Sequence, residues 1–254
     1  MNLHIFPTLQ QLGNAAAAHV AQLSAEAIAA RGRFIVALSG GSLPKLLCPA
    51  LVPQATDWSA WHVFWADERC LPLTHPDSNY FLAKEYLFDH VSIPPAQIHA
   101  PNTSLDPAQT AAVYQNTLAQ IFTAQPLTPL PDDPLLFQPS NLPTLSQFDL
   151  ILLGMGEDGH TASLFPAHPL LKETERWVAP IFDSPKPPPQ RITLTLPVLN
   201  NARHVAFVTA GASKADILPQ VLEAGSALPA HLVQPVSGKL DWFVDEAAAA
   251  QLKR

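Results

Sequence analysis

The amino-acid sequence predicts a layered α/β fold built around a mostly parallel sheet. Short apolar segments rich in β-branched and aromatic residues lie at 34–39, 62–67, 148–154 and 204–211. Their hydrophobicity is nearly continuous, which is typical of strands that are covered on both faces. Helical patterns lie between these strands, so strand and helix alternate along the chain, as in folds with right-handed crossovers.

The helical segments are amphipathic, and the first of them is rich in alanine. They lie at 9–31, 79–88, 107–124 and 212–223. Residues 191–195 (RITLT) alternate in hydrophobicity and predict a further strand. The last segment, 239–253, predicts a strand that runs into a closing helix.

A single domain over residues 1–254 is the simplest organisation, because the α/β pattern continues throughout. Many of the 27 prolines lie in two segments, at about 127–143 and at 184–190. Because helical and strand patterns continue on both sides of each segment, we expect stiff surface loops there and no domain linker.

Composition limits the class of function. The formal net charge is −7, which argues against nucleic acid or an anionic membrane as the main partner. Cys48 and Cys70 form no metal-binding pattern and no disulfide framework. The first residues do not resemble a signal peptide, and no apolar run reaches the length of a membrane span. We expect a cytoplasmic protein, either a monomer or a small homo-oligomer.

Ligands of open α/β sheets bind beyond the carboxyl ends of the strands, so the loops that follow the predicted strands are candidate sites. The first is SGGSLPK, in which Ser39, Gly40, Gly41 and Ser42 follow a strand. Such a loop can cradle a phosphate with its N–H groups and hydroxyls. An ordinary tight turn is an equal alternative for this loop alone. It is neither a Walker loop nor a GxGxxG motif, so nucleotide binding is not indicated.

The second loop is WADERC, which places Asp67 and Arg69 at the edge of the crevice. A solvated strand end with a local ion pair explains this motif equally well. The third is LLGMGEDGHTASLFP, which presents Asp158 and His160 before a predicted short helix. A lone histidine is usually structural, but three glycines around this one indicate a general base in a rigid crevice.

The fourth loop is TAGASKADIL, where Lys214 lies in the first turn of a predicted helix. A cation is mildly unfavourable at that position unless it faces an anion. A plain surface lysine is the simpler alternative. In an acidic, lysine-poor protein, pairing of Lys214 with a phosphate is a credible interpretation.

Together, these four loops and the final DWFVDEAAA segment resemble the glucosamine-6-phosphate isomerase/6-phosphogluconolactonase family over nearly the whole chain. GMGEDGHTASLFP is the most specific segment. The resemblance, closest to the lactonases, implies a three-layer α/β/α fold with a Rossmann-like sheet, similar to glucosamine-6-phosphate deaminase. It also implies hydrolysis of 6-phospho-D-glucono-1,5-lactone to 6-phospho-D-gluconate, in the second step of the oxidative pentose phosphate pathway, without metal or organic cofactor.

The resemblance further implies roles for the candidate residues. His160 is the base that takes a proton from water, and Arg69 and Lys214 balance the negative charge of the substrate. Asp67 matches a catalytic-site carboxylate without a defined role. The phosphate and substrate site is lined by Ser39, Gly40, Gly41, Ser42 and Asp158. The chain departs from the pattern of this family in two places. Leu43 replaces a small hydroxyl residue, and the proline-rich segment at 127–143 is an insertion.

Two alternatives remain. An aminosugar-phosphate isomerase or deaminase resembles this chain, but such enzymes carry a glutamate where the chain has Leu164-Phe165-Pro166, and a tyrosine where it has Arg69. A non-catalytic sugar-phosphate sensor is the other, although the chain enters its α/β pattern without a DNA-binding helical segment. No GxSxG elbow supports a covalent serine mechanism.

Overall fold

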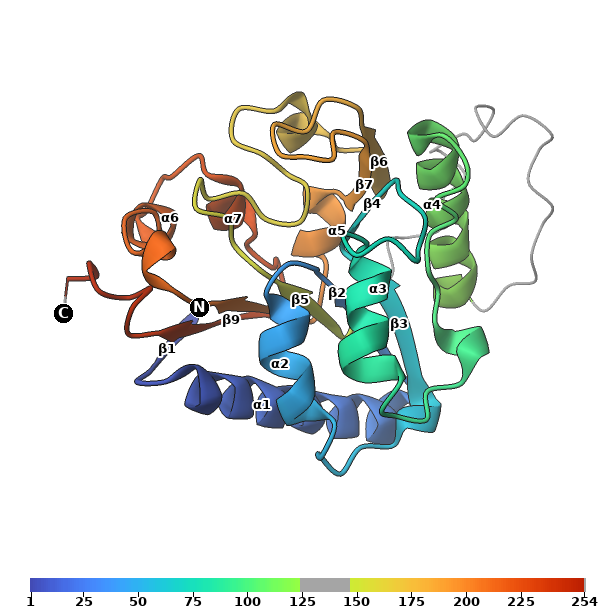
Figure 1. Cartoon of the computed structure of the whole chain (residues 1–254), viewed down its shortest axis with the longest axis horizontal. Helices are drawn as coiled ribbons and strands as arrows, with labels where there is room; N and C mark the ends of the chain where they lie inside the picture. Colours follow the sequence, from blue (N-terminus) through green and yellow to red (C-terminus); the bar gives the residue numbers. More distant parts are fainter. Residues whose placement is uncertain (124–146, 254) are drawn as a thin grey trace.

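The central layer is a parallel sheet of six strands within residues 1–123 and 147–253, which this computed structural model describes (Figure 1). The proline-rich segment predicted at 127–143 lies outside the described residues. In spatial order the strands are β1 (Asn2–Phe6), β9 (Lys239–Asp245), β8 (His204–Thr209), β5 (Leu150–Leu153), β2 (Phe34–Leu38) and β3 (Trp61–Trp65). All pairings are parallel, so the carboxyl ends of β8, β5, β2 and β3 lie at one edge.

A small antiparallel sheet, which the sequence did not predict, lies beside the main one. Its strands, in spatial order, are β4 (Asp67–Arg69), β7 (Arg191–Leu194) and β6 (Val178–Ile181). The chain passes between the two sheets at Ala66, whose N–H donates to Leu38 O (2.8 Å) and whose carbonyl accepts from Leu194 N (2.7 Å). The strand predicted at 62–67 is therefore divided, and its charged end belongs to the small sheet.

The described helices cover both faces of the central sheet. They are α1 (Leu9–Arg31), α2 (Leu43–Leu51), α3 (Asn79–Ala83), α4 (Pro107–Thr123), α5 (Leu196–Asn200), α6 (Leu218–Leu222) and α7 (Pro229–Leu232). Helices α1 to α3 pack on one face, and the others pack with the small sheet on the opposite face. The predicted three-layer α/β/α fold with a mostly parallel sheet is confirmed.

Local signals define the first helix. Thr8 caps α1 by accepting a hydrogen bond from Gln11 N, and Gly32 ends it in the left-handed conformation with φ of 72°. Only glycine adopts that conformation without steric cost, so the helix stops there. The predicted bounds of this helix, 9–31, are those observed.

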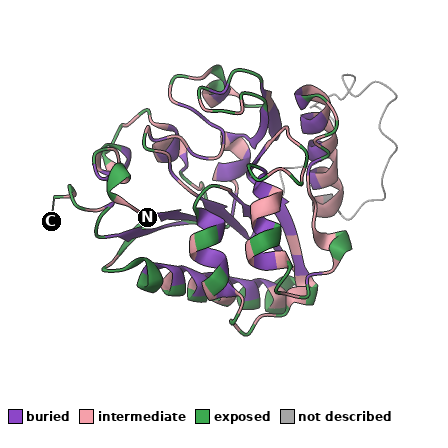
Figure 2. Cartoon of the chain, in the orientation of Figure 1, coloured by how far each residue is buried: buried purple, intermediate pink, exposed green. Residues whose placement is uncertain are grey.

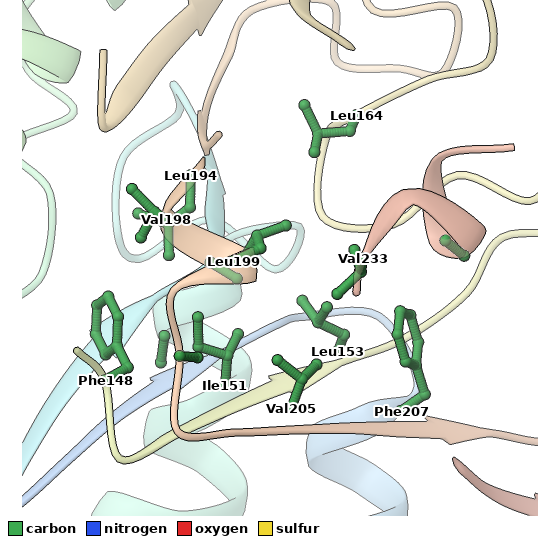
Figure 3. Packing of buried hydrophobic residues seen from close by; sticks show 14 of the residues in the cluster. Phe148, Ile151, Leu153, Leu164, Leu194, Val198, Leu199, Val205, Phe207 and Val233 are labelled. Atoms are coloured by element: carbon green, nitrogen blue, oxygen red, sulfur yellow. The ribbon is translucent and has the colours of Figure 1, made fainter. Parts of the chain in front are cut away.

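The strands of the central sheet are largely buried (Figure 2), and their alternating side chains fill two cores. In β2, Phe34, Val36 and Leu38 face the α1–α2 layer, whereas Ile35 and Ala37 face the opposite layer. Figure 3 shows part of this second core, where residues of β5 and β8 pack against residues of α5. Burial on both faces explains the near-continuous hydrophobicity of the strands.

Two helices predicted in the last part of the chain differ from the structure. Within 212–223, a 3-10 turn at Ala212–Lys214 and the short helix α6 replace one continuous helix. The closing helix after β9 is wrong, because the described residues there form successive turns. None of the helices within residues 1–123 and 147–253 combines the length and apolar character needed to cross a membrane.

Candidate active site

A pocket of about 240 Å³ lies at the carboxyl edge of the central sheet. Its walls come from all four loops that the sequence singled out. The residues that line it are Ser39, Gly40, Gly41, Ser42, Asp67, Arg69, Gly154, Met155, Gly156, His160, Ala162, Arg191, Val208, Thr209, Ala210 and Lys214. Of the predicted site residues, Asp158 alone is outside this lining.

A second and larger pocket, of about 400 Å³, lies at the opposite edge of the sheet, near the amino ends of β5, β8 and β9. Two arginines that line this pocket already pair with a carboxylate. Arg31 Nη2 lies 2.7 Å and Arg203 Nε lies 3.6 Å from Asp149 Oδ1. None of the predicted site residues lies there. The chemistry is therefore concentrated in the smaller pocket.

The loop of residues 39–42 joins β2 to α2. Gly41 has φ of 67°, and Pro44 lies in the first turn of α2, as predicted. The main-chain N–H of Ser39 donates to Leu152 O at 3.0 Å, which ties the loop to the neighbouring strand β5. The loop therefore brings main-chain N–H groups and the N-terminus of α2 to the pocket, an arrangement that suits an anion.

His160 is held by its own loop, residues 154–160. Asp158 Oδ1 pairs with His160 Nδ1 and also accepts the His160 main-chain N–H at 3.2 Å. A Cβ atom on Gly156 would lie 2.0 Å from His160 Nδ1, so only glycine fits beneath the ring. The imidazole also packs against Phe165, with ring centroids 4.8 Å apart. This packing fixes the ring beside the pocket.

The pKa of His160 favours the neutral imidazole, the form that can accept a proton. Burial lowers the pKa of His160 from its ordinary value, and the nearby carboxylates of Asp158 and Asp67 oppose this effect. The imidazole is therefore mainly neutral at neutral pH. Because Nδ1 faces Asp158, the neutral ring carries its proton there and leaves Nε2 as the acceptor.

The predicted short helix after His160 is wrong. Thr161 and Leu164 instead form an isolated antiparallel bridge that closes a tight turn. Thr161 Oγ1 also donates to Gly154 O at 2.8 Å, and Ala162 adopts a positive φ of 48°. The turn fixes the start and end of the His160 loop and directs Ser163 into the interior.

Asp67 is almost fully buried, and its carboxylate accepts two hydrogen bonds. Ser163 Oγ donates to Oδ2 at 2.7 Å, and Asn79 Nδ2 donates to Oδ1 at 3.2 Å. Asn79 Nδ2 also donates to Asp67 O at 2.7 Å. The position of the carboxylate is thus set by the first residue of α3 and by the turn after His160.

Glu68, the neighbour of Asp67, points away from the pocket and caps α3. Its carboxylate accepts the main-chain N–H groups of Arg69, Asn79 and Tyr80 at 2.7 to 2.8 Å and the Ser78 hydroxyl at 3.1 Å. Complete burial raises the pKa of Glu68 to about 7, although these hydrogen bonds oppose the shift. Glu68 therefore fixes the backbone on which Asp67 and Arg69 are carried.

Three cations reach the pocket: Arg69, Arg191 and Lys214. Arg69 Nη1 donates to Asp77 O at 2.5 Å, while its buried Nε has no partner among the described residues. Lys214 follows β8 in the 3-10 turn, and burial lowers its pKa. An anionic ligand would restore the interactions that these groups lose on leaving water.

Three further residues belong to the site that the sequence did not predict: Arg191, Asn79 and Ser163. Arg191 begins β7, and its only sequence signal is a charge at the start of a strand of alternating hydrophobicity. Ser163 lies within the GMGEDGHTASLFP motif, but nothing local indicates that it meets Asp67, 96 residues earlier. In the described part of the chain, no group of three or more His, Cys, Asp or Glu residues is arranged to hold a metal ion.

Comparisons with known proteins agree with this fold. The family model described as glucosamine-6-phosphate isomerases/6-phosphogluconolactonase matches residues 7–242. Human 6-phosphogluconolactonase is 46% identical, over 98% of this chain and 93% of its own length. The 6-phosphogluconolactonase structure from Trypanosoma brucei superimposes with a TM-score of 0.81, at 27% identity and covering 99% and 98% of the two chains. A monomeric glucosamine-6-phosphate deaminase shares the fold, with a TM-score of 0.76 at 18% identity, covering 99% and 100%.

Proposed function

Because this chain belongs to the glucosamine-6-phosphate isomerase/6-phosphogluconolactonase family, we propose that it hydrolyses 6-phospho-D-glucono-1,5-lactone to 6-phospho-D-gluconate. This reaction is the second step of the oxidative pentose phosphate pathway. The observation that carries the proposal is the His160–Asp158 pair beside a pocket lined by three cations. A neutral imidazole next to a site for anions suits the attack of water on a phosphorylated ester.

His160 acts as the general base in this proposal. Its Nε2 takes a proton from a water molecule while the water oxygen attacks the lactone carbonyl carbon. Asp158 holds Nδ1–H and stabilises the imidazolium that forms, and the negative charge of Asp67 acts in the same direction. The carbonyl oxygen becomes negative as the new C–O bond forms. The carbonyl then re-forms as the ring C–O bond breaks, and the departing oxygen takes the proton that His160 accepted, which gives the open-chain acid and restores the neutral imidazole.

The cations and the first loop bind the charged substrate. We propose that residues 39–42 line the phosphate end of the pocket. Main-chain N–H groups and the Ser42 hydroxyl donate hydrogen bonds to the phosphate oxygens there. Arg69 and Lys214 balance the negative charge of the substrate, and Arg191 adds a third positive charge. Donors already fixed before the reaction stabilise developing charge without reorganising, which is the main source of rate enhancement in such sites.

The isomerase or deaminase alternative uses an acidic side chain that this chain does not carry at the corresponding position. The corresponding stretch is Leu164-Phe165-Pro166, in which Leu164 and Phe165 are buried and Phe165 packs against the His160 ring. A proton shuttle between carbon atoms needs a second acid or base that faces the sugar ring. The sensor alternative gives no reason for the pairing of His160 with Asp158.

The test is the rate of hydrolysis of freshly generated 6-phosphogluconolactone, with and without the protein, above the spontaneous background. We expect fast hydrolysis that persists with a chelator present. His160→Asn should lose about 100- to 10,000-fold in kcat while circular dichroism and melting temperature stay close to the wild type. No acceleration by a folded wild-type sample would reject the proposal, and glucosamine-6-phosphate would then be tried as substrate. Near-normal turnover by His160→Asn would reject the base alone.

We also propose a cytoplasmic monomer or small homo-oligomer, with no nucleic-acid or membrane partner. The net charge of −7 supports the absence of polyanionic partners. Both cysteines are free thiols, and Cys48 is buried, which agrees with a reducing compartment. Light scattering of the purified chain measures its oligomeric state directly.

A further inference from the structure

The guanidinium group of Arg191 is almost fully occupied by the protein itself. Its Nε donates to Pro188 O at 3.0 Å, and Nη2 donates to Lys186 O and Pro187 O at 2.9 and 3.0 Å. Nη1 donates to Ser163 Oγ at 3.3 Å. These four bonds use four of the five N–H groups of an arginine. Arg191 is therefore rigidly fixed, and it retains one N–H and its charge for a ligand.

Ser163 stands between this arginine and the Asp67 carboxylate. Its side chain is completely buried, its hydroxyl donates to Asp67 Oδ2 at 2.7 Å, and its main-chain N–H donates to Thr193 Oγ1 at 3.2 Å. Arginine has only donors and a carboxylate has only acceptors, so the hydroxyl must accept from Arg191 and donate to Asp67. The direction of both hydrogen bonds is thus determined.

One hydroxyl separates two opposite charges in the interior. In the described part of the chain, the Asp67 carboxylate and the Arg191 guanidinium form no direct ion pair, although the two groups interact electrostatically. Buried opposite charges attract strongly because the surroundings screen them little. Without the hydroxyl, the Asp67 carboxylate can turn toward the fixed guanidinium and form a direct ion pair. Each charge would then be partly cancelled for a ligand in the pocket.

The orientation of Asp67 matters to the base. The charged groups that act on His160 are Asp158 on its own loop, Asp67 on β4 and Lys186 on the 184–190 loop. Burial lowers the pKa of His160, and the negative charge of Asp67 raises it. A carboxylate turned toward Arg191 would support the imidazolium less, both at equilibrium and in the transition state.

We propose that Ser163 is a positioning residue for lactone hydrolysis: its hydroxyl holds Asp67 apart from Arg191 and so keeps the carboxylate available to the pocket that Asp67 and His160 both line. This role rests on the proposed function of the pocket. Ser163 is buried and outside the pocket lining, so it acts through Asp67 without contact with substrate. A shift in the direction of one charged group is enough to change a rate by about a hundredfold.

The experiment measures kcat, KM and the pH dependence of kcat/KM with phosphorylated lactone. The variants are Ser163→Ala, Ser163→Cys, Ser163→Thr, Asp67→Asn and the double variant Ser163→Ala/Asp67→Asn. Thr110→Val is the matched control, because Thr110 is also fully buried and its hydroxyl donates to two main-chain carbonyls away from the pocket. Circular dichroism and melting temperature are recorded for each variant.

We expect Ser163→Ala to lower kcat about 10- to 100-fold and to change KM less than about threefold. The acid limb of the kcat/KM profile of this variant should move to lower pH. The negative charge of Asp67 then raises the pKa of His160 less than in the wild type. Ser163→Thr, which keeps a hydroxyl, should recover most of kcat. In the Asp67→Asn background the serine substitution should change kcat less than about twofold, because the two residues act as one unit.

Several outcomes overturn the proposal. Kinetics of Ser163→Ala equal to those of Thr110→Val would reduce Ser163 to a structural residue, and so would full additivity in the Asp67→Asn background. If Ser163→Ala does not fold, the nearly isosteric Ser163→Cys decides, with normal kcat and an unshifted pH profile counting against the role. The failure of the proposed function is a different result, in which the wild type itself does not accelerate hydrolysis.

Discussion

A side chain on Gly40 would collide with Asn79, because a Cβ atom at position 40 would lie 1.7 Å from Asn79 Oδ1. Asn79 in turn donates twice to Asp67, once to its carbonyl and once to its carboxylate. The loop after β2 and the strand β4 are therefore fitted together through one amide. Glycine at position 40 is needed for space, since its neighbour Gly41 is the one with positive φ.

Gly40→Ala should damage activity through Asn79. The new methyl group must displace the Asn79 side chain, which releases Asp67 and leaves buried polar groups unpaired. We expect a loss of about 1–3 kcal/mol in the free energy of unfolding, measured by urea denaturation, together with a lower kcat/KM. The double variant Gly40→Ala/Asn79→Ala removes the collision, so it should be no worse than Asn79→Ala alone. Additive losses would show that Gly40 is needed for another reason.

Asp158→Asn should separate the rate of the reaction from its pH dependence. The carboxylate raises the pKa of His160 against the larger effect of burial, so its removal lowers that pKa further. The base must be neutral, and kcat/KM falls as the pH drops through the pKa of His160. The acid limb of the variant should therefore lie at lower pH than that of the wild type.

The same variant should lose at least about tenfold in kcat, because Nδ1–H no longer has a charged partner and the imidazolium loses support. The measurement is a full pH–rate profile with subtraction of spontaneous hydrolysis at each pH. Asp183→Asn is the control, since Asp183 pairs with His168 at 3.1 Å outside the pocket. An acid limb that moves to higher pH would contradict the assigned role of Asp158.

Lys214→Ala should weaken binding of the phosphorylated substrate specifically. A charge-assisted hydrogen bond to phosphate contributes about 1.5–3 kcal/mol, which corresponds to roughly a 10- to 100-fold rise in KM. The unphosphorylated glucono-1,5-lactone should show little change. Lys172→Ala, an exposed lysine outside the pocket, controls for the loss of one positive charge. An equal effect on both lactones would remove Lys214 from the phosphate end.

Glu68→Gln should change how stability depends on pH. Burial raises the pKa of Glu68 in the folded state to about 7, from an ordinary value of 4.5. The folded protein therefore binds this proton more tightly than the unfolded chain, and the contribution to the free energy of unfolding falls as the pH rises from about 4.5 to about 7. The total change is about 3 kcal/mol.

The measurement is urea denaturation at several pH values between 4.5 and 8. We expect Glu68→Gln to lack this component, so that the wild type loses stability relative to the variant as the pH rises. Glu85→Gln, a substitution of an exposed glutamate, should keep the slope of the wild type. Parallel slopes for wild type and Glu68→Gln would mean that the proton is not taken up at Glu68.

Local signals explain which elements were predicted well. Helix α1 has a capping Thr8 and a terminating Gly32, and β2 is bounded by the glycines of the next loop, so both were placed within a residue. The closing helix was wrong because the alanine run after β9 is short, and Asp245 Oδ1 instead accepts the N–H groups of Ala248 and Gly211 in a turn.

Two strands escaped prediction for different reasons. Strand β1 is largely exposed, so it lacks the apolar character of the inner strands. Strand β6 has four residues and contains Pro180, which argues against a strand in sequence-based reasoning. Without β6, the small antiparallel sheet could not be foreseen.

The residues of the candidate site also fall into two groups, those with a local sequence signal and those without one. Residues that belong to glycine-rich loops after strands, such as His160 and Ser42, carry their signal locally, and the structure brings them into one pocket. Arg191 and Ser163 reach Asp67 only through the small sheet and the turn after His160. Their part in the site depends on distances across the fold, which no local pattern contains.

The pairing of β1 with β9 affects how the protein folds during its synthesis. Asn2 lies opposite Asp241 in the sheet, so within the described residues β1 pairs only with β9, a strand made much later in the chain. During translation, β1 remains without this partner until β9 has been made. An unpaired strand edge with exposed Leu3 and Ile5 is open to wrong pairing throughout that interval. Nascent chains stalled before β9 should therefore be the forms most dependent on chaperones.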